Sequence, residues 1–317
     1  MEIKKVGIIG AGSMGSAIAE VMAYNGLEVI LKDQNMELTE KGIKNIKRIL
    51  DDFEKYLRER PIKEIERIEK LGIKLSDDQK EQLKKNLGKS IDKNSILSRI
   101  KPTENFDELK DCDLIIEAIF ENQEIKNKLF EDLSKILSEK SILASNTSSL
   151  SITEMASHYR IPENVIITHF FNPPYTLPLV EIVPALQTSE NTVNTVYEFF
   201  NNLKNHRERI VPVKVKERTG FVVNRILIPM INEALKITDE GIADYRTVDI
   251  AMKKGAGMPM GPFELADYVG VDIVYHVLRS FREAFGDNYI APESLKYMIS
   301  AGWWGMKSGK GFYEYKK

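Results

Sequence analysis

The segment that most constrains the fold is KKVGIIGAGSMGSAIAEVMAYNGLEVILKD, near the N-terminus. It predicts a strand, a tight turn, a helix and a second strand, with glycines spaced as G-x-G-x-x-G. The first glycine permits the turn, the second lets the backbone approach a pyrophosphate, and the third lets the helix pack against the strand. This segment predicts dinucleotide binding through the loop residues Gly10, Ala11, Gly12, Ser13, Met14 and Gly15.

The second predicted strand ends at Asp33, which indicates which dinucleotide binds. A carboxylate at this position accepts hydrogen bonds from the adenosine ribose hydroxyls. It also repels the additional phosphate of NADP, so the expected cofactor is NAD. The alternative interpretation is a glycine-rich turn in some other α/β protein.

The order of predicted elements indicates two domains. Strands alternate with helices in most of residues 1–216, which is typical of a Rossmann-like, mainly parallel sheet. A Lys-, Glu- and Ile-rich stretch at about 36–90 interrupts this alternation and predicts an extended helical arm. Residues 217–317 have a helical pattern only, with a proline or glycine at several helix ends. We therefore expect an α/β domain followed by an all-helical domain.

Composition narrows the class of protein. The chain of 317 residues is 43% hydrophobic and 29% charged, and its net charge is -2. A protein with this net charge has no positive electrostatic field that would attract nucleic acid or an anionic membrane. No apolar run approaches the roughly 18 residues that span a bilayer. A single cysteine, Cys112, allows no intramolecular disulfide, which is typical of proteins in a reducing compartment. We therefore expect a cytoplasmic protein. We also predict no metal site.

Polar residues follow the predicted strands at one edge of the sheet, where open α/β sheets bind ligands. Among them, His169 follows the run VIIT, and Glu181 lies between apolar residues in LVEIV. An imidazole suits removal of a hydroxyl proton because its ordinary pKa of about 6.5 lies near neutral pH. A carboxylate on the other ring nitrogen fixes the tautomer and stabilises the imidazolium. We expect His169 to be the general base and Glu181 its partner.

Three neutral polar residues are candidates for holding the reacting oxygen or a neighbouring carbonyl: Ser148, Asn172 and Asn224. His169, Asn172 and Asn224 also have purely structural interpretations. A histidine at a strand end is often structural, Asn172 before Pro173 suits a turn, and Asn224 suits a helix residue that bonds the backbone.

The chain resembles the L-3-hydroxyacyl-CoA dehydrogenase family, including 3-hydroxybutyryl-CoA dehydrogenases. The resemblance covers almost the whole length. It rests on GAGSMGSAIAE, IIEAIFEN, SNTSSL, HFFNP, LVEIV, TGFVVNRIL, GAGMPMGPFELADYVG and KSGKGFYEY, in this order.

The resemblance implies NAD-dependent, reversible oxidation of an (S)-3-hydroxyacyl-CoA to the 3-ketoacyl-CoA. It implies a homodimer formed through the helical domain. His169 and Glu181 match the catalytic pair, and Ser148 and Asn224 match polar residues near the substrate oxygen. The positions implied to contact NAD are Asp33, Glu121, Lys126, Ser148, Asn172 and Lys307.

Two features depart from the family pattern. The arm is longer, and Ile46 and Phe53 occupy the positions nearest to the family's CoA contacts, so Lys47, Arg48 and Lys55 are only candidates for phosphate contacts. The segment NPPYTLPLVEIVP also resembles L-gulonate dehydrogenases and lambda-crystallins, which leaves a sugar-acid dehydrogenase as an alternative. A catalytically silent dinucleotide-binding structural protein is the alternative from another functional class.

Overall fold

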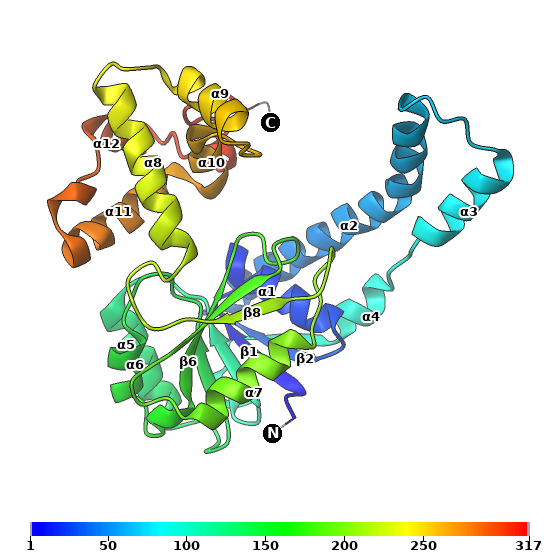
Figure 1. Cartoon of the computed structure of the whole chain (residues 1–317). Helices are drawn as coiled ribbons and strands as arrows, with labels where there is room; N and C mark the ends of the chain where they lie inside the picture. The colour runs from blue at the N-terminus through cyan, green and yellow to red at the C-terminus, as the bar shows by residue number, and fades with distance from the viewer. Residues whose placement is uncertain (1, 316–317) are drawn as a thin grey trace. The chain divides into compact units, whose positions relative to one another are not determined.

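A computed structural model describes residues 2–315, and the chain divides into two compact units (Figure 1). The first comprises Met1–Thr147 and Ser151–Lys214. The second comprises Ser148–Leu150 and Val215–Lys317. In the part of the chain that is described, no helix has the length and apolar character needed to cross a membrane.

A sheet of eight strands forms the centre of the first unit. The strands are β1 (Lys5–Ile9), β2 (Glu28–Lys32), β3 (Ile100–Thr103), β4 (Leu114–Glu117), β5 (Ile142–Ser145), β6 (Val165–Phe170), β7 (Leu179–Pro184) and β8 (Val211–Lys214). Their order across the sheet is β3-β2-β1-β4-β5-β6-β7-β8. All neighbours in this described sheet are parallel except β6 and β7, which are antiparallel. The predicted mainly parallel sheet is confirmed.

Strand β3 was not predicted from the sequence. It contains Pro102, and a proline within a short run argues against a strand in the middle of a sheet. The structure places β3 at the edge, beside β2, where the missing N–H of a proline is tolerated.

Helices and short 3-10 turns connect the strands of the first unit. They are α1 (Ser13–Tyr24), α4 (Lys93–Ser98), η1 (Phe106–Leu109), α5 (Gln123–Leu133), α6 (Ile152–Ser157), η2 (Pro162–Asn164) and α7 (Glu190–Asn201). Helices α1 and α7 pack on alternate residues of the strands in one apolar core, which includes Ile8, Ile18, Met22, Ile116, Ile182, Val196 and Phe200. The parallel direction of β1, β4 and β5 places the loops that follow these strands at the same end of the sheet.

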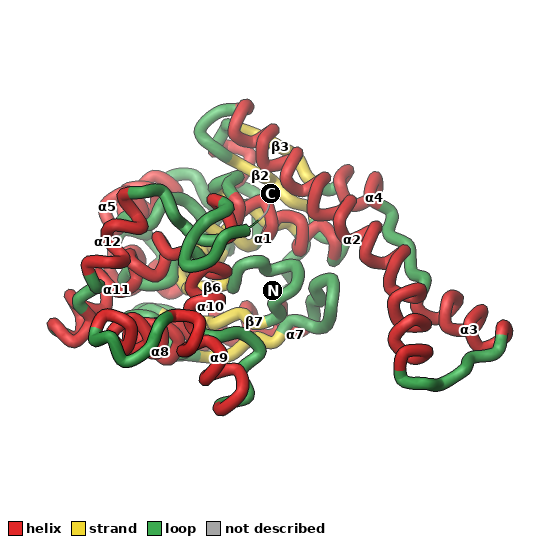
Figure 2. Tube along the Cα trace, turned by 90° about the horizontal axis from the view of Figure 1, so that it is seen from above, coloured by secondary structure: helices red, strands yellow, loops and turns green. Residues whose placement is uncertain are grey.

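The predicted arm consists of α2 (Met36–Lys70) and α3 (Asp77–Leu87). The first half of α2 packs on α1, and Gly42 permits the approach, because an added Cβ would lie 2.8 Å from the Cβ of Ala11. The second half continues beyond the sheet, and α3 runs back beside it (Figures 1 and 2). Helix α3 begins after the N-cap Ser76, which forms a capping box with Gln79.

The second unit is helical, as predicted. Its elements are α8 (Val223–Asp239), α9 (Tyr245–Gly255), α10 (Pro262–Val269), α11 (Val271–Phe285), η3 (Asp287–Tyr289), α12 (Glu293–Ser300) and η4 (Met306–Ser308). Helix α10 begins at Pro262, and Gly270 separates it from α11, as the sequence indicates. The apolar core of this unit includes Ile231, Leu235, Phe263, Leu278, Phe281 and Leu295.

Two buried aspartates anchor the C-terminal segment to the second unit. The carboxylate of Asp267 accepts hydrogen bonds from the backbone N–H groups of Phe312 and Tyr313, each at 2.9 Å, and from the hydroxyl of Tyr315. The carboxylate of Asp249 accepts the hydroxyl of Tyr313 at 2.8 Å. The segment that ends the described chain is therefore part of the core of its unit.

Candidate active site

The glycine-rich loop between β1 and α1 has the geometry of a pyrophosphate site. Gly10 has a φ of 101°, and a Cβ on Gly15 would lie 1.7 Å from the carbonyl oxygen of Gly10, so both positions require glycine. An added Cβ on Gly12 would meet no described atom within 4 Å, so this side of the loop is open. Gly12 is also the N-cap of α1, without a capping bond from a described side chain. The helix N-terminus is thus suited to an anion.

A cavity of about 520 Å³ lies beside this loop, within the first unit. Its lining is mostly apolar and includes Ile9, Gly10, Gly12, Lys32, Asp33, Phe106, Ile119, Phe120, Ile125 and Leu129. Asp33 is fixed at the cavity: its Oδ2 accepts the N–H of Ala11 at 2.6 Å, and its Oδ1 accepts that of Gln34 at 2.7 Å. An apolar cavity with a fixed carboxylate beside a phosphate loop fits the adenosine half of NAD.

Lys32, the last residue of β2, was not predicted as a site residue. Its Nζ lies 3.4 Å from the ring centroid of Phe106, which is a cation–π contact on the cavity wall. Burial lowers the pKa of Lys32, and the nearby charge of Asp33 partly offsets that effect. The sequence signal that could have indicated Lys32 is its position directly before Asp33 at the end of the strand.

His169 and Glu181 form a buried pair. They are direct partners in the antiparallel β6–β7 ladder, so both side chains lie on the same face of the sheet. Nδ1 of His169 lies 2.8 Å from Oε2 of Glu181. Glu181 is fully buried, and the side chain of His169 is 7% exposed. The structure therefore brings together the two residues that were predicted as the catalytic pair, and their contact leaves Nε2 as the ring nitrogen that points away from the carboxylate.

A second buried His–Glu pair, His206 and Glu20, packs against helices and an aromatic ring. Nε2 of His206 lies 2.9 Å from Oε1 of Glu20 in α1. The ring of Phe53 in the arm stacks on His206, with the ring centroids 3.7 Å apart and an interplanar angle of 6°. The backbone N–H of His206 donates to the carbonyl of Tyr175. His206 lies between α7 and β8, so this pair joins that segment to α1, to α2 and to the segment between β6 and β7, and we interpret it as structural.

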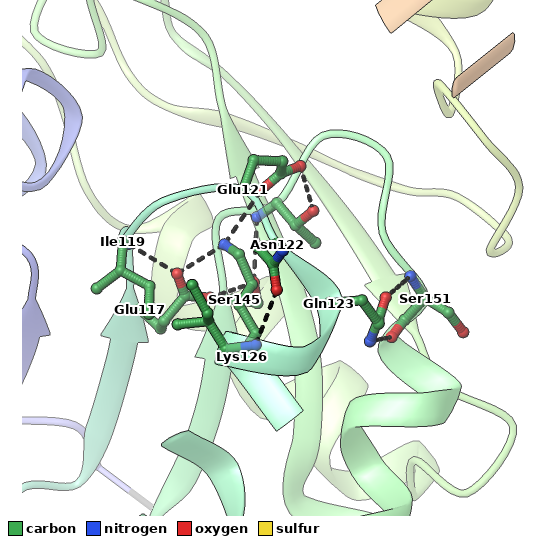
Figure 3. Close-up of polar contacts among 10 residues, drawn as sticks. Glu117, Ile119, Glu121, Asn122, Gln123, Lys126, Ser145 and Ser151 are labelled. Carbon is green, nitrogen blue, oxygen red and sulfur yellow. Dashed lines mark hydrogen bonds and ion pairs between the residues drawn. The ribbon is translucent and has the colours of Figure 1, made fainter. Parts of the chain in front are cut away.

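A network of polar side chains lies at the ends of β4 and β5 (Figure 3). Oε1 of Glu117 accepts hydrogen bonds from Nζ of Lys126 and from the backbone N–H of Ile119, both at 2.7 Å. Oε2 of Glu117 accepts the hydroxyl of Ser145 at 2.6 Å. Lys126 also contacts Oε2 of Glu121 at 3.1 Å.

The network includes predicted and unpredicted residues. Glu121 and Lys126 were predicted as NAD contacts, and the structure brings them together. Burial by itself lowers the pKa of Lys126, but the charges and hydrogen bonds of Glu117 and Glu121 outweigh it, so the net shift is upward. The roles of Glu117 and Ser145 were missed, because they depend on contacts between β4, β5 and α5.

The remaining predicted residues occupy several elements. Asn172 is exposed after β6, and its peptide bond to Pro173 is cis. Ser148 lies in the turn that follows β5. Asn224 is in the first turn of α8. Lys307 lies in η4, and its Nζ is 2.6 Å from the carboxylate of Asp272.

In residues 2–315, no group of three or more His, Cys, Asp or Glu side chains is placed to hold a metal ion. A phosphate loop, a cavity that fits adenosine and a buried His–Glu pair near the end of a strand are features of nicotinamide-dependent oxidoreductases.

Comparison with known proteins identifies the family. Residues 5–71 and 63–217 match the NAD-binding domain of 3-hydroxyacyl-CoA dehydrogenase, and residues 220–315 match its C-terminal domain. The chain belongs to the 3-hydroxyacyl-CoA dehydrogenase family, and it is an NAD-dependent oxidoreductase.

Three similar proteins match over at least 92% of their own length. A 3-hydroxybutyryl-CoA dehydrogenase from Clostridioides difficile is 40% identical over 99% of this chain and 100% of its own. The mitochondrial hydroxyacyl-coenzyme A dehydrogenase of Homo sapiens is 36% identical over 99% of this chain and 92% of its own. The crystal structure of (S)-3-hydroxybutyryl-CoA dehydrogenase from Ralstonia eutropha has a TM-score of 0.80 and 36% identity, with both chains fully covered.

Proposed function

We propose that this enzyme oxidises (S)-3-hydroxybutyryl-CoA, and related short (S)-3-hydroxyacyl-CoA thioesters, to the 3-ketoacyl-CoA in a reversible reaction. The observation that carries the proposal is the 2.8 Å contact between His169 and Glu181 in the sheet that also carries the dinucleotide loop. Full-length similarity to 3-hydroxybutyryl-CoA dehydrogenases supports this substrate class.

His169 acts as the general base. Its Nδ1 is engaged by Glu181, so its Nε2 takes the proton from the substrate hydroxyl. The Glu181 carboxylate then stabilises the imidazolium and keeps the ring oriented. In the reverse direction the imidazolium returns this proton to the carbonyl oxygen. Bound NAD supplies the acceptor for the hydride that leaves the substrate carbon.

The remaining predicted residues bind the cofactor and the substrate. Gly10–Gly15 hold the pyrophosphate, and Asp33 holds the adenosine ribose. Glu121, Lys126, Asn172 and Lys307 bind the rest of NAD. Ser148 and Asn224 hold the oxygen atoms near the reacting carbon, and Ser148 also contacts the cofactor. The fit of the loop and the adenosine cavity supports the cofactor roles.

Residues 1–216 serve as the NAD-binding domain, and residues 217–317 as the substrate and dimerisation domain. Exposed apolar side chains on the helical unit support a homodimer: Val222, Ile226, Ile250 and Tyr297 are 47%, 69%, 59% and 68% exposed. We place the protein in the cytoplasm and its reaction in β-oxidation chemistry.

The substrate is tested by supplying acetoacetyl-CoA and following the absorbance of NADH, with L-gulonate and NAD in a parallel assay. We expect rapid reduction of acetoacetyl-CoA and little oxidation of gulonate. Turnover of gulonate alone rejects the acyl-CoA assignment in favour of a sugar-acid dehydrogenase. Cofactor binding without turnover of either substrate indicates a catalytically silent protein.

A further inference from the structure

The side chain of Lys32 carries a buried charge that has no ionic partner in the part of the chain that is described. The residue is 6% exposed, and its Nζ forms no hydrogen bond or ion pair with residues 2–315. Its contact is with the ring face of Phe106, whose centroid lies 3.4 Å away. An ammonium has three N–H donors, and a ring face is a weaker partner for them than a carboxylate or a phosphate. Lys32 is therefore suited to interact with an anionic group of a ligand.

Lys32 lies near the carboxylate that we assign to the adenosine ribose. Lys32 and Asp33 both line the cavity next to the glycine-rich loop. The two oxygens of Asp33 accept the backbone N–H groups of Ala11 and Gln34 rather than Nζ of Lys32. The two charges are still close enough to interact, because the charge of Asp33 opposes the lowering of the Lys32 pKa by burial. The end of β2 thus presents one negative and one positive group to the same cavity.

These two charges have opposite effects on the binding of NADP. NADP differs from NAD by a phosphate on the adenosine ribose, and the carboxylate of Asp33 repels that phosphate. A nearby lysine attracts it, as a nearby arginine does in dinucleotide-binding domains that accept NADP. Because both cofactors contain the same pyrophosphate, an effect of Lys32 on that group cancels when the two affinities are compared. The ratio of the affinities for NADH and NADPH therefore reports the balance between the two charges.

We propose that Lys32 is a specificity-determining residue of the cofactor site: its positive charge partly cancels the repulsion by Asp33 and so reduces the preference for NAD over NADP. The proposal rests on the function proposed above and concerns the choice of cofactor. Asp33 sets the direction of the preference, and Lys32 limits its size. Lys128 also lines the cavity, but it forms ion pairs with Glu131 and Asp132 at 3.4 and 3.2 Å, so its charge is already compensated.

The test is a pair of binding titrations, with NADH and with NADPH, by calorimetry on the full-length protein without substrate. Lys32→Met keeps a long unbranched side chain and removes its charge. We expect the ratio of the dissociation constant of NADPH to that of NADH to rise by about three- to tenfold relative to the wild type, as expected for the loss of one partly buried charge. Lys32→Arg keeps the charge and should keep the wild-type ratio. The matched control is Lys128→Met, which removes a compensated cation from the same cavity and should also keep the ratio.

An unchanged ratio in Lys32→Met overturns the proposal. So does an equal rise in Lys128→Met, which would reflect a general loss of positive charge, or in Lys32→Arg, which would reflect side-chain shape. If the wild type binds NADPH too weakly to measure, the same rise is expected when Lys32→Met is added to Asp33→Asn. If Lys32→Met does not fold, Lys32→Gln removes the same charge and must shift the ratio in the same direction. Binding of NADH without reduction of acetoacetyl-CoA rejects the proposed function and leaves the binding ratios valid, which separates the two outcomes.

Discussion

Nδ1 of His169 lies 2.8 Å from Oε2 of Glu181, across the β6–β7 ladder in which the two residues are direct partners. The antiparallel pairing creates this contact, since directly opposed residues in a ladder place their side chains on the same face. A shift of the register by one residue would place the two side chains on opposite faces of the sheet. The geometry of the proposed proton relay therefore depends on the backbone pairing of two buried strands.

The first prediction concerns this pair. His169→Gln removes the base but keeps a polar side chain, so we expect kcat to fall by at least about 10²-fold. Glu181→Gln keeps a hydrogen-bonding group but removes the charge that stabilises the imidazolium, so it should also lower kcat. Steady-state kinetics with acetoacetyl-CoA measures the loss. NADH binding should change little in both variants, and near-normal turnover in His169→Gln would place the base elsewhere.

The second prediction concerns Asp33 and the choice of cofactor. Asp33→Asn removes the charge that repels the additional phosphate of NADP. The preference for NADH over NADPH, measured as a ratio of kcat/KM values, should fall by at least about tenfold, which corresponds to about 1.4 kcal/mol. Asp132→Asn is the matched control, because Asp132 lines the same cavity but is paired with Lys128 and Lys135. Equal effects of the two substitutions would argue against a specific role for Asp33.

The third prediction separates the structural His–Glu pair from the catalytic one. Glu20 is fully buried, and its Oε2 has no hydrogen-bond partner among residues 2–315. His206→Leu leaves this carboxylate without its His206 contact, so the free energy of unfolding should fall by about 3–5 kcal/mol. Urea denaturation measures this loss, with the exposed His276→Leu as the control. A stability equal to that of the control would show that the pair contributes little.

The fourth prediction concerns stability at alkaline pH. Burial and the hydrogen bond to Asp249 raise the pKa of Tyr313 above its ordinary value of 10. Burial and the adjacent Asp267 do the same for Tyr315. The folded state then holds these protons when the unfolded state has lost them, so stability falls as the pH rises above about 10.

Tyr313→Phe should therefore make the free energy of unfolding less dependent on pH above 10, although it lowers stability at neutral pH. Urea denaturation at several pH values measures the slope. Tyr297→Phe, at an exposed position on α12, is the control and should keep the wild-type slope. Identical slopes in all three proteins would contradict the prediction.

The sequence predicts the features whose signals are local. The glycine spacing specifies the phosphate loop, and alternating strands and helices specify the parallel sheet. The contact between Glu20 and His206 joins residues 186 positions apart, and that between Glu117 and Ser145 joins residues 28 apart. No periodicity connects such pairs, because their proximity results from how helices and strands pack. The pairing of His169 with Glu181 was predictable since neighbouring strands bring these residues together.

The two halves of α2, the long helix of the arm, have different structural roles. Ile46 and Leu50 in the first half of α2 belong to the core of the sheet, and Gly42 lies against the phosphate loop. The second half pairs with α3 beyond the sheet. Insertions or deletions at the tip would therefore alter the reach of this helical hairpin without disturbing the loop. The length of the hairpin and the packing of the phosphate loop are therefore structurally independent of one another.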